Sequence, residues 1–361
     1  MRFVQIFYAT VVLVIIGGLG PERVQYSTGS SSLLISPLEK EIVLEAQWQV
    51  ERRWTELPSE KLWTVGTDDT RASFLLEPSQ VKIGPKNHVF VLDRGDYSIK
   101  VFDETGTFLH SVAGTRGRAP GELMNPTDFD IDEKRRLWVA DPPNGRVSVF
   151  RADGAFSHSL QLDHRPHRLA VINEGNEFYT AWLSPTKNAL FGRYDSEGNL
   201  QKKMGQVVEN QARKGVALGG SIATTSDGSL YYTLTRAGYL FRFDAEGNPV
   251  FEIETVDPAP IPEVIVDDRG GRRVDPSASI MSLGLQVVNG TLAISSVVEE
   301  GVRQDVRRAF DIYSTEGKYQ HSIPLPTGTS RARLASGRIY TLTDTSLIAW
   351  NYSMESRLGH R

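Results

Sequence analysis

The chain has 361 residues and a formal net charge of −4, and it contains no cysteine. The missing cysteine excludes disulfides, thiol nucleophiles, thiolate metal sites and a cysteine-borne lipid anchor. The charge provides no basic field, so we expect no nucleic-acid partner, while 32 glycines and 18 prolines suit many short strands joined by tight turns.

Residues 3–20 form a strongly apolar stretch between Arg2 and Pro21. A positive charge before an apolar run is typical of a signal peptide, and the length also approaches that of a membrane-spanning helix. Pro21 is a poor neighbour for a cleavage site, so a cleaved signal peptide and an uncleaved anchor both stay open. We therefore expect a periplasmic or extracellular chain that contacts the membrane only through residues 3–20.

Residues 77–111 and 125–159 repeat the same pattern, position against position. Self-similarity at a period of roughly 40 to 50 residues predicts a propeller or a solenoid. A hairpin turn with glycine, which tolerates positive φ, follows an aromatic-containing strand in five places. These turns lie at residues 103–106, 152–154, 196–199, 245–248 and 315–318.

The predicted second strands of the repeat occur six times, which predicts six four-stranded antiparallel blades. The last copy ends after three strands, and an open sheet edge is normally avoided. Residues 61–66 have the sequence position of a fourth strand without a blade of its own. We predict that they complete the last blade and close the ring.

This organisation predicts four parts of the chain, namely 1–20 (signal peptide or anchor), 21–60 (linker and extension), 61–355 (propeller) and 356–361 (tail). Within the extension, residues 41–57 fit either a short amphipathic helix or an extra strand. Residues 257–279 form an insertion between the fourth and fifth blades. Their content of Pro, Gly, Asp and Arg favours a solvated loop over a lid.

The pattern P-x-x-V-x-I, V-x-V-x-D and I-x-V-F-D-x-x-G-x-F resembles the NHL-repeat class of six-bladed β-propellers. The glycine-rich connector at residues 114–123 is similar to the link between blades in bacterial exported members. The likeness covers about residues 61–352 and is sharpest at 77–162. It implies an all-β fold, while propellers host enzymes, scaffolds and binding modules alike.

The innermost strand of a propeller blade lines the central channel, so the residues that begin these strands are the candidate site. Three of them are arginines, whose planar guanidinium matches two oxygens of a carboxylate or phosphate. The competing interpretation pairs the arginines in salt bridges with Asp128, Asp130 or neighbouring loops. The candidate ligand-binding residues are Gln80, Asp128, His167, Arg168, Arg331 and Arg333.

Other chemistry is less favoured by the sequence. His164 and His167 beside Asp163 resemble zinc ligands, but an odd separation in a strand sends two side chains to opposite faces. A calcium-dependent lactonase needs several acidic and amide ligands on the channel axis, and only Asp128 has a suitable position. We predict no cofactor, with calcium or zinc as the alternative. Recurrence of Asp93 and Asp141 in the repeat indicates turn-capping rather than catalysis.

The sequence therefore predicts a non-enzymatic binding module, exported or membrane-tethered, for a protein, a peptide or a small anionic ligand. The alternative is a metal-dependent, lactonase-like hydrolase or lyase that uses the central channel.

Overall fold

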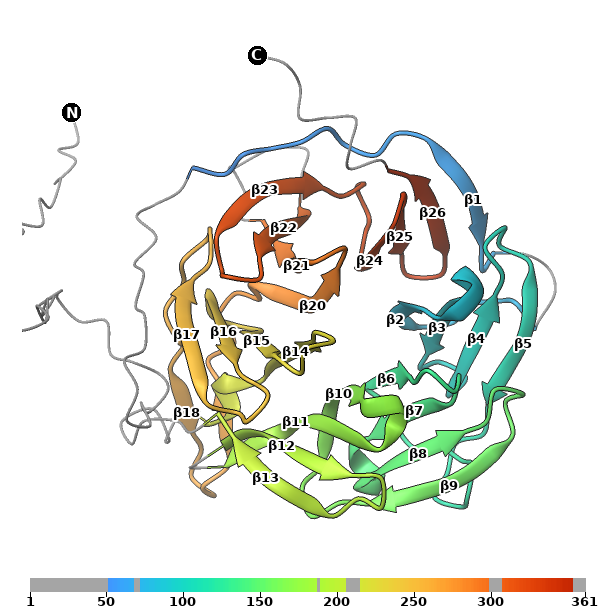
Figure 1. Cartoon of the computed structure of the whole chain (residues 1–361), viewed down its shortest axis with the longest axis horizontal. Coiled ribbons are helices and arrows are strands. Elements are labelled where there is room, and N and C mark those ends of the chain that lie inside the picture. Colours follow the sequence, from blue (N-terminus) through green and yellow to red (C-terminus); the bar gives the residue numbers. More distant parts are fainter. Residues whose placement is uncertain (1–50, 68–71, 187–188, 206–214, 299–306, 353–361) are drawn as a thin grey trace, which may run out of the picture. The chain divides into compact units, whose positions relative to one another are not determined.

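Four-stranded antiparallel sheets follow one another around a ring in the computed structural model (Figure 1), which describes residues 51–67, 72–186, 189–205, 215–298 and 307–352. The chain divides into compact units at residues 1–32 and 33–361, and the first lies outside the described residues. The predicted signal peptide or anchor and the C-terminal tail lie outside them as well. In the described part, no helix is long and apolar enough to span a membrane.

In five of the four-stranded sheets the strands run outward from the channel in chain order, and in the sixth β1 takes the outer position after β24, β25 and β26. The first three blades comprise β2 (Pro78–Ile83), β3 (Val89–Asp93), β4 (Ser98–Phe102) and β5 (Phe108–Ala113); β6 (Asp128–Ile131), β7 (Leu137–Asp141), β8 (Arg146–Phe150) and β9 (Phe156–Gln161); β10 (Pro166–Ile172), β11 (Glu177–Thr186), β12 (Ala189–Asp195) and β13 (Leu200–Met204).

The other three blades follow the same plan. They comprise β14 (Gly220–Thr224), β15 (Leu230–Leu234), β16 (Tyr239–Phe243) and β17 (Pro249–Glu254); β20 (Ser282–Val288), β21 (Thr291–Val297), β22 (Arg308–Ser314) and β23 (Tyr319–Pro324); β24 (Arg331–Ala335), β25 (Arg338–Leu342), β26 (Leu347–Asn351) and β1 (Lys61–Val65). Short 3₁₀ turns are η1 (Pro85–Asn87), η2 (Pro142–Asn144), η3 (Asn173–Gly175) and η4 (Gly215–Leu218). The predicted six-bladed, all-β fold is confirmed.

Strand β1 joins the last blade, because it pairs antiparallel with β26 from Lys61 opposite Trp350 to Val65 opposite Leu347. This is the pairing that the sequence predicts for residues 61–66. The sixth and first blades also share a buried cluster that includes Val65, Phe102 and Tyr340. Apolar packing between neighbouring blades is therefore continuous across the point where the ends of the ring meet.

The recurring turn and the recurring aspartate both have the structural roles predicted for them. The turn glycines all have positive φ, between 83° and 89°, at Gly106, Gly154, Gly198, Gly247 and Gly317. Asp93 accepts hydrogen bonds from the backbone N–H groups of Leu76, Glu77 and Gly95, at 2.8 to 3.0 Å. Asp141 does the same for Met124 and Asn125. These buried carboxylates fix the link into their own blade.

The insertion at 257–279 is more ordered than the sequence suggested. It carries a hairpin of β18 (Val264–Val266) and β19 (Arg272–Val274), and much of this hairpin is exposed. The sequence interpretation as a loop relied on composition. Each strand of the hairpin has only three residues, and an alternation of apolar and polar residues over so short a length does not identify a strand.

Of residues 41–57, for which the sequence left a short helix or an extra strand open, 41–50 lie outside the described residues, and 51–57 form no helix or regular strand. Trp54 forms an isolated parallel bridge with Ser322 on the outer strand of the fifth blade. Arg52, whose side chain is 5% exposed, forms ion pairs with Asp257 and with Asp311, which is 3% exposed. This contact clamps the segment before β1 onto the fifth blade.

Deleting residues 1–66 should lower the melting temperature by roughly 10 °C, because it removes the Arg52 clamp and leaves β26 as an open edge. Deleting only residues 1–32 should leave the melting temperature near that of the full chain. Differential scanning calorimetry of the two deletions makes the comparison, and equal melting temperatures would refute the role assigned to β1.

Arg52→Met should lower the free energy of unfolding by about 3 kcal/mol, because it leaves the buried Asp311 carboxylate without its counter-charge. Adding Asp311→Asn to that variant should restore part of the loss. Urea unfolding measures both, with Arg272→Met on the exposed hairpin as the control, expected to change stability by less than about 0.5 kcal/mol. A loss as small as that of the control would mean that the clamp contributes little.

Candidate functional site

The central cavity is lined by the first strand of every blade and has a volume of about 190 Å³. Side chains alternate along a strand, so every second residue of these strands faces the channel. Strand pairing places the residues in two layers, since each blade offers two equivalent positions. We call the position nearer the start of each strand the outer layer, and the position two residues further along the inner layer. The outer layer is Gln80, Asp128, Arg168, Ser221, Gly284 and Arg331, and the inner layer is Lys82, Asp130, Ala170, Ala223, Gln286 and Arg333.

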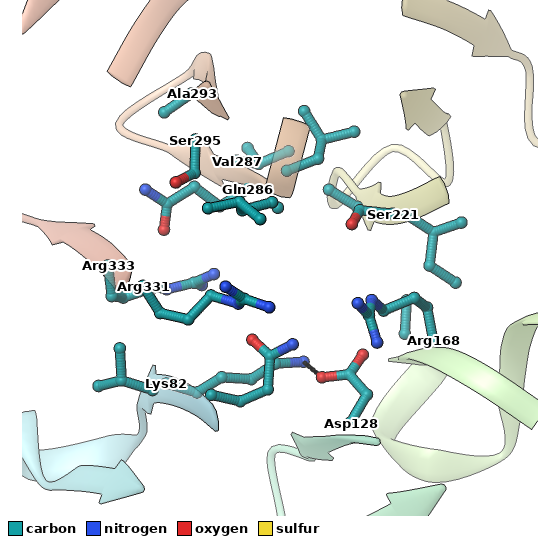
Figure 2. Close-up of a pocket in the computed structure, with 18 of the residues that line it drawn as sticks. Lys82, Asp128, Arg168, Ser221, Gln286, Val287, Ala293, Ser295, Arg331 and Arg333 are labelled. Atoms are coloured by element: carbon teal, nitrogen blue, oxygen red, sulfur yellow. Dashed lines mark ion pairs between the residues drawn. The ribbon is translucent and has the colours of Figure 1, made fainter. Parts of the chain in front are cut away.

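Positive charge dominates this lining, because Lys82, Arg168, Arg331 and Arg333 face only two carboxylates, Asp128 and Asp130, among the lining residues. Figure 2 shows Arg331 and Arg168 extending toward the centre from opposite sides, with the Lys82–Asp128 ion pair between them along one wall.

The two carboxylates are already engaged. Lys82 Nζ lies 3.1 Å from Asp130 Oδ1 and 3.7 Å from Asp128 Oδ1. The other oxygens accept backbone N–H groups of β10, from Leu169 to Asp128 at 2.9 Å and from Val171 to Asp130 at 2.8 Å. Asp128 and Asp130 therefore tie the first three blades together at the channel, and the single charge of Lys82 is shared between their two carboxylates.

Within the residues that the structure describes, the arginines do not form the salt bridges that the competing sequence interpretation assigned to them. Arg168 Nη1 donates to the backbone carbonyls of Thr127 and His167, at 3.1 and 3.3 Å, and Arg331 Nη1 donates to that of Ser330 at 2.9 Å. Among the described residues, no hydrogen bond or ion pair holds the Arg333 guanidinium. These contacts leave the positive charge of the three arginines without a bonded carboxylate in the described part.

Burial lowers the pKa values of all three arginines, and neighbouring arginine charges add to the effect at Arg331. Burial, followed by the charges of Arg168, Arg308 and Arg94, lowers the pKa of Arg331 to about 10. Burial also lowers the pKa of Arg168 and of Arg333, and nearby aspartates partly offset that effect. All three groups stay protonated at neutral pH, and an anion between them would relieve the repulsion.

Five of the six predicted site residues line one cavity: Gln80, Asp128, Arg168, Arg331 and Arg333. His167 does not line it, because consecutive side chains of β10 point to opposite faces and Arg168 takes the channel side. Sequence reasoning missed Lys82 and Gln286. The sequence contained the signal for both. Each lies two residues after a residue at the start of an innermost strand, and residues two apart on a strand face the same side.

The two histidines considered as zinc ligands lie in different surroundings. The His164 ring packs against Trp182, with ring centroids 4.0 Å apart, while His167 is largely buried one strand position before Arg168. Within the described ranges, no three side chains of His, Asp or Glu gather closely enough to hold a metal ion.

Residues 69–235 match the model of the DUF5128 family, which is described as a 6-bladed beta-propeller. A search of curated proteins finds no match. The fold of the described residues and that family description agree. The chain is a six-bladed β-propeller.

Solved structures share this fold at low sequence identity. A protein of Bacteroides fragilis predicted to be exported is 11% identical, with a TM-score of 0.56, and the match covers 84% of this chain and 99% of that one. A DUF4221 member from Bacteroides vulgatus is 9% identical, with a TM-score of 0.53 and coverage of 84% and 98%. Inactive virginiamycin B lyase from Staphylococcus aureus with quinupristin is 12% identical, with a TM-score of 0.52 and coverage of 81% and 100%. At these identities the likeness extends to the fold alone.

His167→Gln should make the protein less sensitive to acid. Burial, and secondly the charge of Arg168, lowers the pKa of His167 to about 3, and its Nδ1 atom has no hydrogen-bond partner in the described structure. The unfolded state binds a proton near pH 6.5 and the folded state does not, so stability is lost as pH falls from about 6.5 to about 3, by up to ~4 kcal/mol.

Urea unfolding at a series of pH values, followed by circular dichroism, compares wild type with His167→Gln. The variant should lose less stability between pH 6.5 and pH 4, while His164→Gln should resemble wild type more closely. Parallel pH profiles for wild type and His167→Gln would contradict the assignment of a neutral, buried His167.

Proposed function

We propose that this propeller is an exported or membrane-tethered binding module whose central cavity takes a small anionic ligand, or the anionic end of a larger one. The observation that carries the proposal is the cluster of Arg168, Arg331 and Arg333 on one cavity, without a bonded carboxylate in the described residues. A planar guanidinium is well suited to a carboxylate or a phosphate, because it presents two parallel N–H donors.

The size of the cavity supports a small ligand. Its volume of about 190 Å³ is below the roughly 300 to 1,000 Å³ of pockets that hold drug-sized molecules. A protein or peptide partner would thus reach the arginines with only one terminal group, and its remaining contacts would lie on the surrounding loops.

Export is part of the same proposal. The apolar residues 3–20 after Arg2 support a signal peptide or an anchor. Because the chain has no cysteine, the proposal includes neither disulfides nor a lipid attached to a cysteine. The likeness to a protein predicted to be exported adds support from the fold. We propose a periplasmic or extracellular location.

The test measures anion-dependent stabilisation and affinity. Acetate, sulfate and phosphate are titrated into the full chain, with thermal unfolding and isothermal calorimetry as the readouts, at constant ionic strength because exposed charges are screened by salt. We expect at least one anion to raise the melting temperature, following the linkage between ligand binding and folding.

Arg331→Met should abolish that stabilisation and should melt no lower than wild type in the absence of anion, because the removed charge is repelled by Arg168, Arg308 and Arg94. Arg338→Met, in the same blade and outside the cavity lining, is the matched control and should bind as wild type does. Equal anion binding by wild type and Arg331→Met would rule out the arginine cluster as the site.

A further inference from the structure

Gln286 is a buried carboxamide without a hydrogen-bond partner. It lies in β20, the innermost strand of the fifth blade, lines the cavity and is 4% exposed. Both its Oε1 and its Nε2 atoms lack a partner in the described structure. Buried side-chain amides are nearly always hydrogen-bonded, so a group with both functions open points to a molecule that completes them.

The space beside this amide is open and adjoins the arginines. In the inner layer, Gln286 lies between Ala223 of the fourth blade and Arg333 of the sixth, and the outer-layer position of its own strand is Gly284. A Cβ atom placed on Gly284 would meet only the Cβ of Ser295, at 4.0 Å. One small molecule can therefore contact Gln286 and the guanidiniums of β24 together.

In the view of Figure 2, Gln286 and Ser221 lie on the wall opposite Lys82 and Asp128, with Arg331 and Arg168 reaching in from the two sides. The cavity thus has a cationic region and, across from the Lys82–Asp128 pair, a neutral wall of amide, hydroxyl and aliphatic groups. A ligand that fills both regions needs an anionic group and a neutral polar group close together.

A simple anion would satisfy only half of the amide. Carboxylates, sulfate and phosphate at neutral pH mainly accept hydrogen bonds, so they can accept one from Nε2 but leave Oε1 without a donor. In an extended residue, by contrast, the N–H and the carbonyl oxygen point to the same side, as they do at a strand edge. Such a pair matches the Oε1 and Nε2 atoms of one carboxamide.

Resting on the proposed function, we infer that the ligand is an N-acylated amino acid, either free or as the C-terminal residue of a peptide. Its amide N–H donates to Gln286 Oε1, and Gln286 Nε2 donates to a carboxylate oxygen. The remaining carboxylate lone pairs accept from Arg331 and Arg333. The small Gly284 and Ala223 positions leave room for the acyl group.

The test uses two acids of nearly equal shape with the full chain. N-acetylglycine carries the amide N–H, and 4-oxopentanoate has a methylene in its place. Wild type should bind N-acetylglycine at least about tenfold more tightly by calorimetry, because the second acid leaves Oε1 unpaired. Equal affinity for the two acids would overturn the inference.

Gln286→Leu is the matched variant. Both acids should lose the contact with Nε2, but only N-acetylglycine also loses the contact with Oε1, so its affinity should fall at least about tenfold more than that of 4-oxopentanoate. The melting temperature of Gln286→Leu, expected to equal or exceed that of wild type, checks that the variant folds. An equal loss for both acids would overturn the role of the amide.

Failure of the inference is separable from failure of the proposed function. Binding of acetate or phosphate that requires Arg331, without any preference for N-acetylglycine, leaves the anion site standing and refutes the amide-bearing ligand. No binding of any anion refutes both.

The source of the ligand is resolved by two further probes, N-acetylglycylglycine and its C-terminal amide. If N-acetylglycylglycine binds as tightly as N-acetylglycine, the ligand is assigned as a peptide C-terminus. If N-acetylglycine binds and N-acetylglycylglycine does not, the ligand is assigned as a free acylated amino acid. Binding of the C-terminal amide as tightly as the acid would overturn the inference, because that molecule has no carboxylate.

Discussion

Closure of the ring is the constraint on which the rest of this molecule depends. The channel exists only while six inner strands face one axis, and their positions are held by packing between each blade and its two neighbours. The pairing of β1 with β26 supplies the sixth blade with its outer strand, and the Arg52 contacts hold the preceding segment on the fifth blade. The arginines of β24 are therefore positioned by residues some 270 positions earlier in the chain.

The repeat provides a scaffold, and the differences between blades provide the chemistry. Equivalent positions of the six inner strands hold glutamine, aspartate, arginine, serine, glycine and arginine in the outer layer. Asp128 and Asp130 serve the scaffold, because Lys82 and the β10 backbone satisfy them. The guanidiniums of the third and sixth blades are left to face the cavity. The structure thus distinguishes charged residues that are satisfied by the scaffold from charged residues that remain available to a ligand, although all of them occupy equivalent positions of the repeat.

Sequence reasoning reached most of the fold because the decisive signals recur from one repeat to the next. The turn glycines determine their own turns, and each second-strand aspartate binds backbone N–H groups about 16 residues earlier in the link to its own blade. The repeat itself shows that the last blade lacks a strand, although the strand that completes it lies at the other end of the ring. The site was reached in part. Alternation along a strand explains the error at His167 and the omission of Lys82 and Gln286, since the prediction stopped at the strand entrances. The docking of Arg52 on Asp311 had no local signal, because the partners are 259 residues apart.

Gly284 has no side chain, and it lies on the fifth blade, whereas Arg331 and Arg333 lie on the sixth. In the proposed site, the room for the acyl group and the charge that binds the carboxylate therefore depend on different blades. A Cβ atom added at that position would meet only the Cβ of Ser295, at 4.0 Å, so a small side chain has room there beside Gln286. A related propeller could therefore accept shorter or longer acyl groups through a change at one residue while it keeps the same anion contacts. In the function that we propose, the sixth blade binds the charged group of the ligand, and the fifth blade limits the size of the acyl group attached to it.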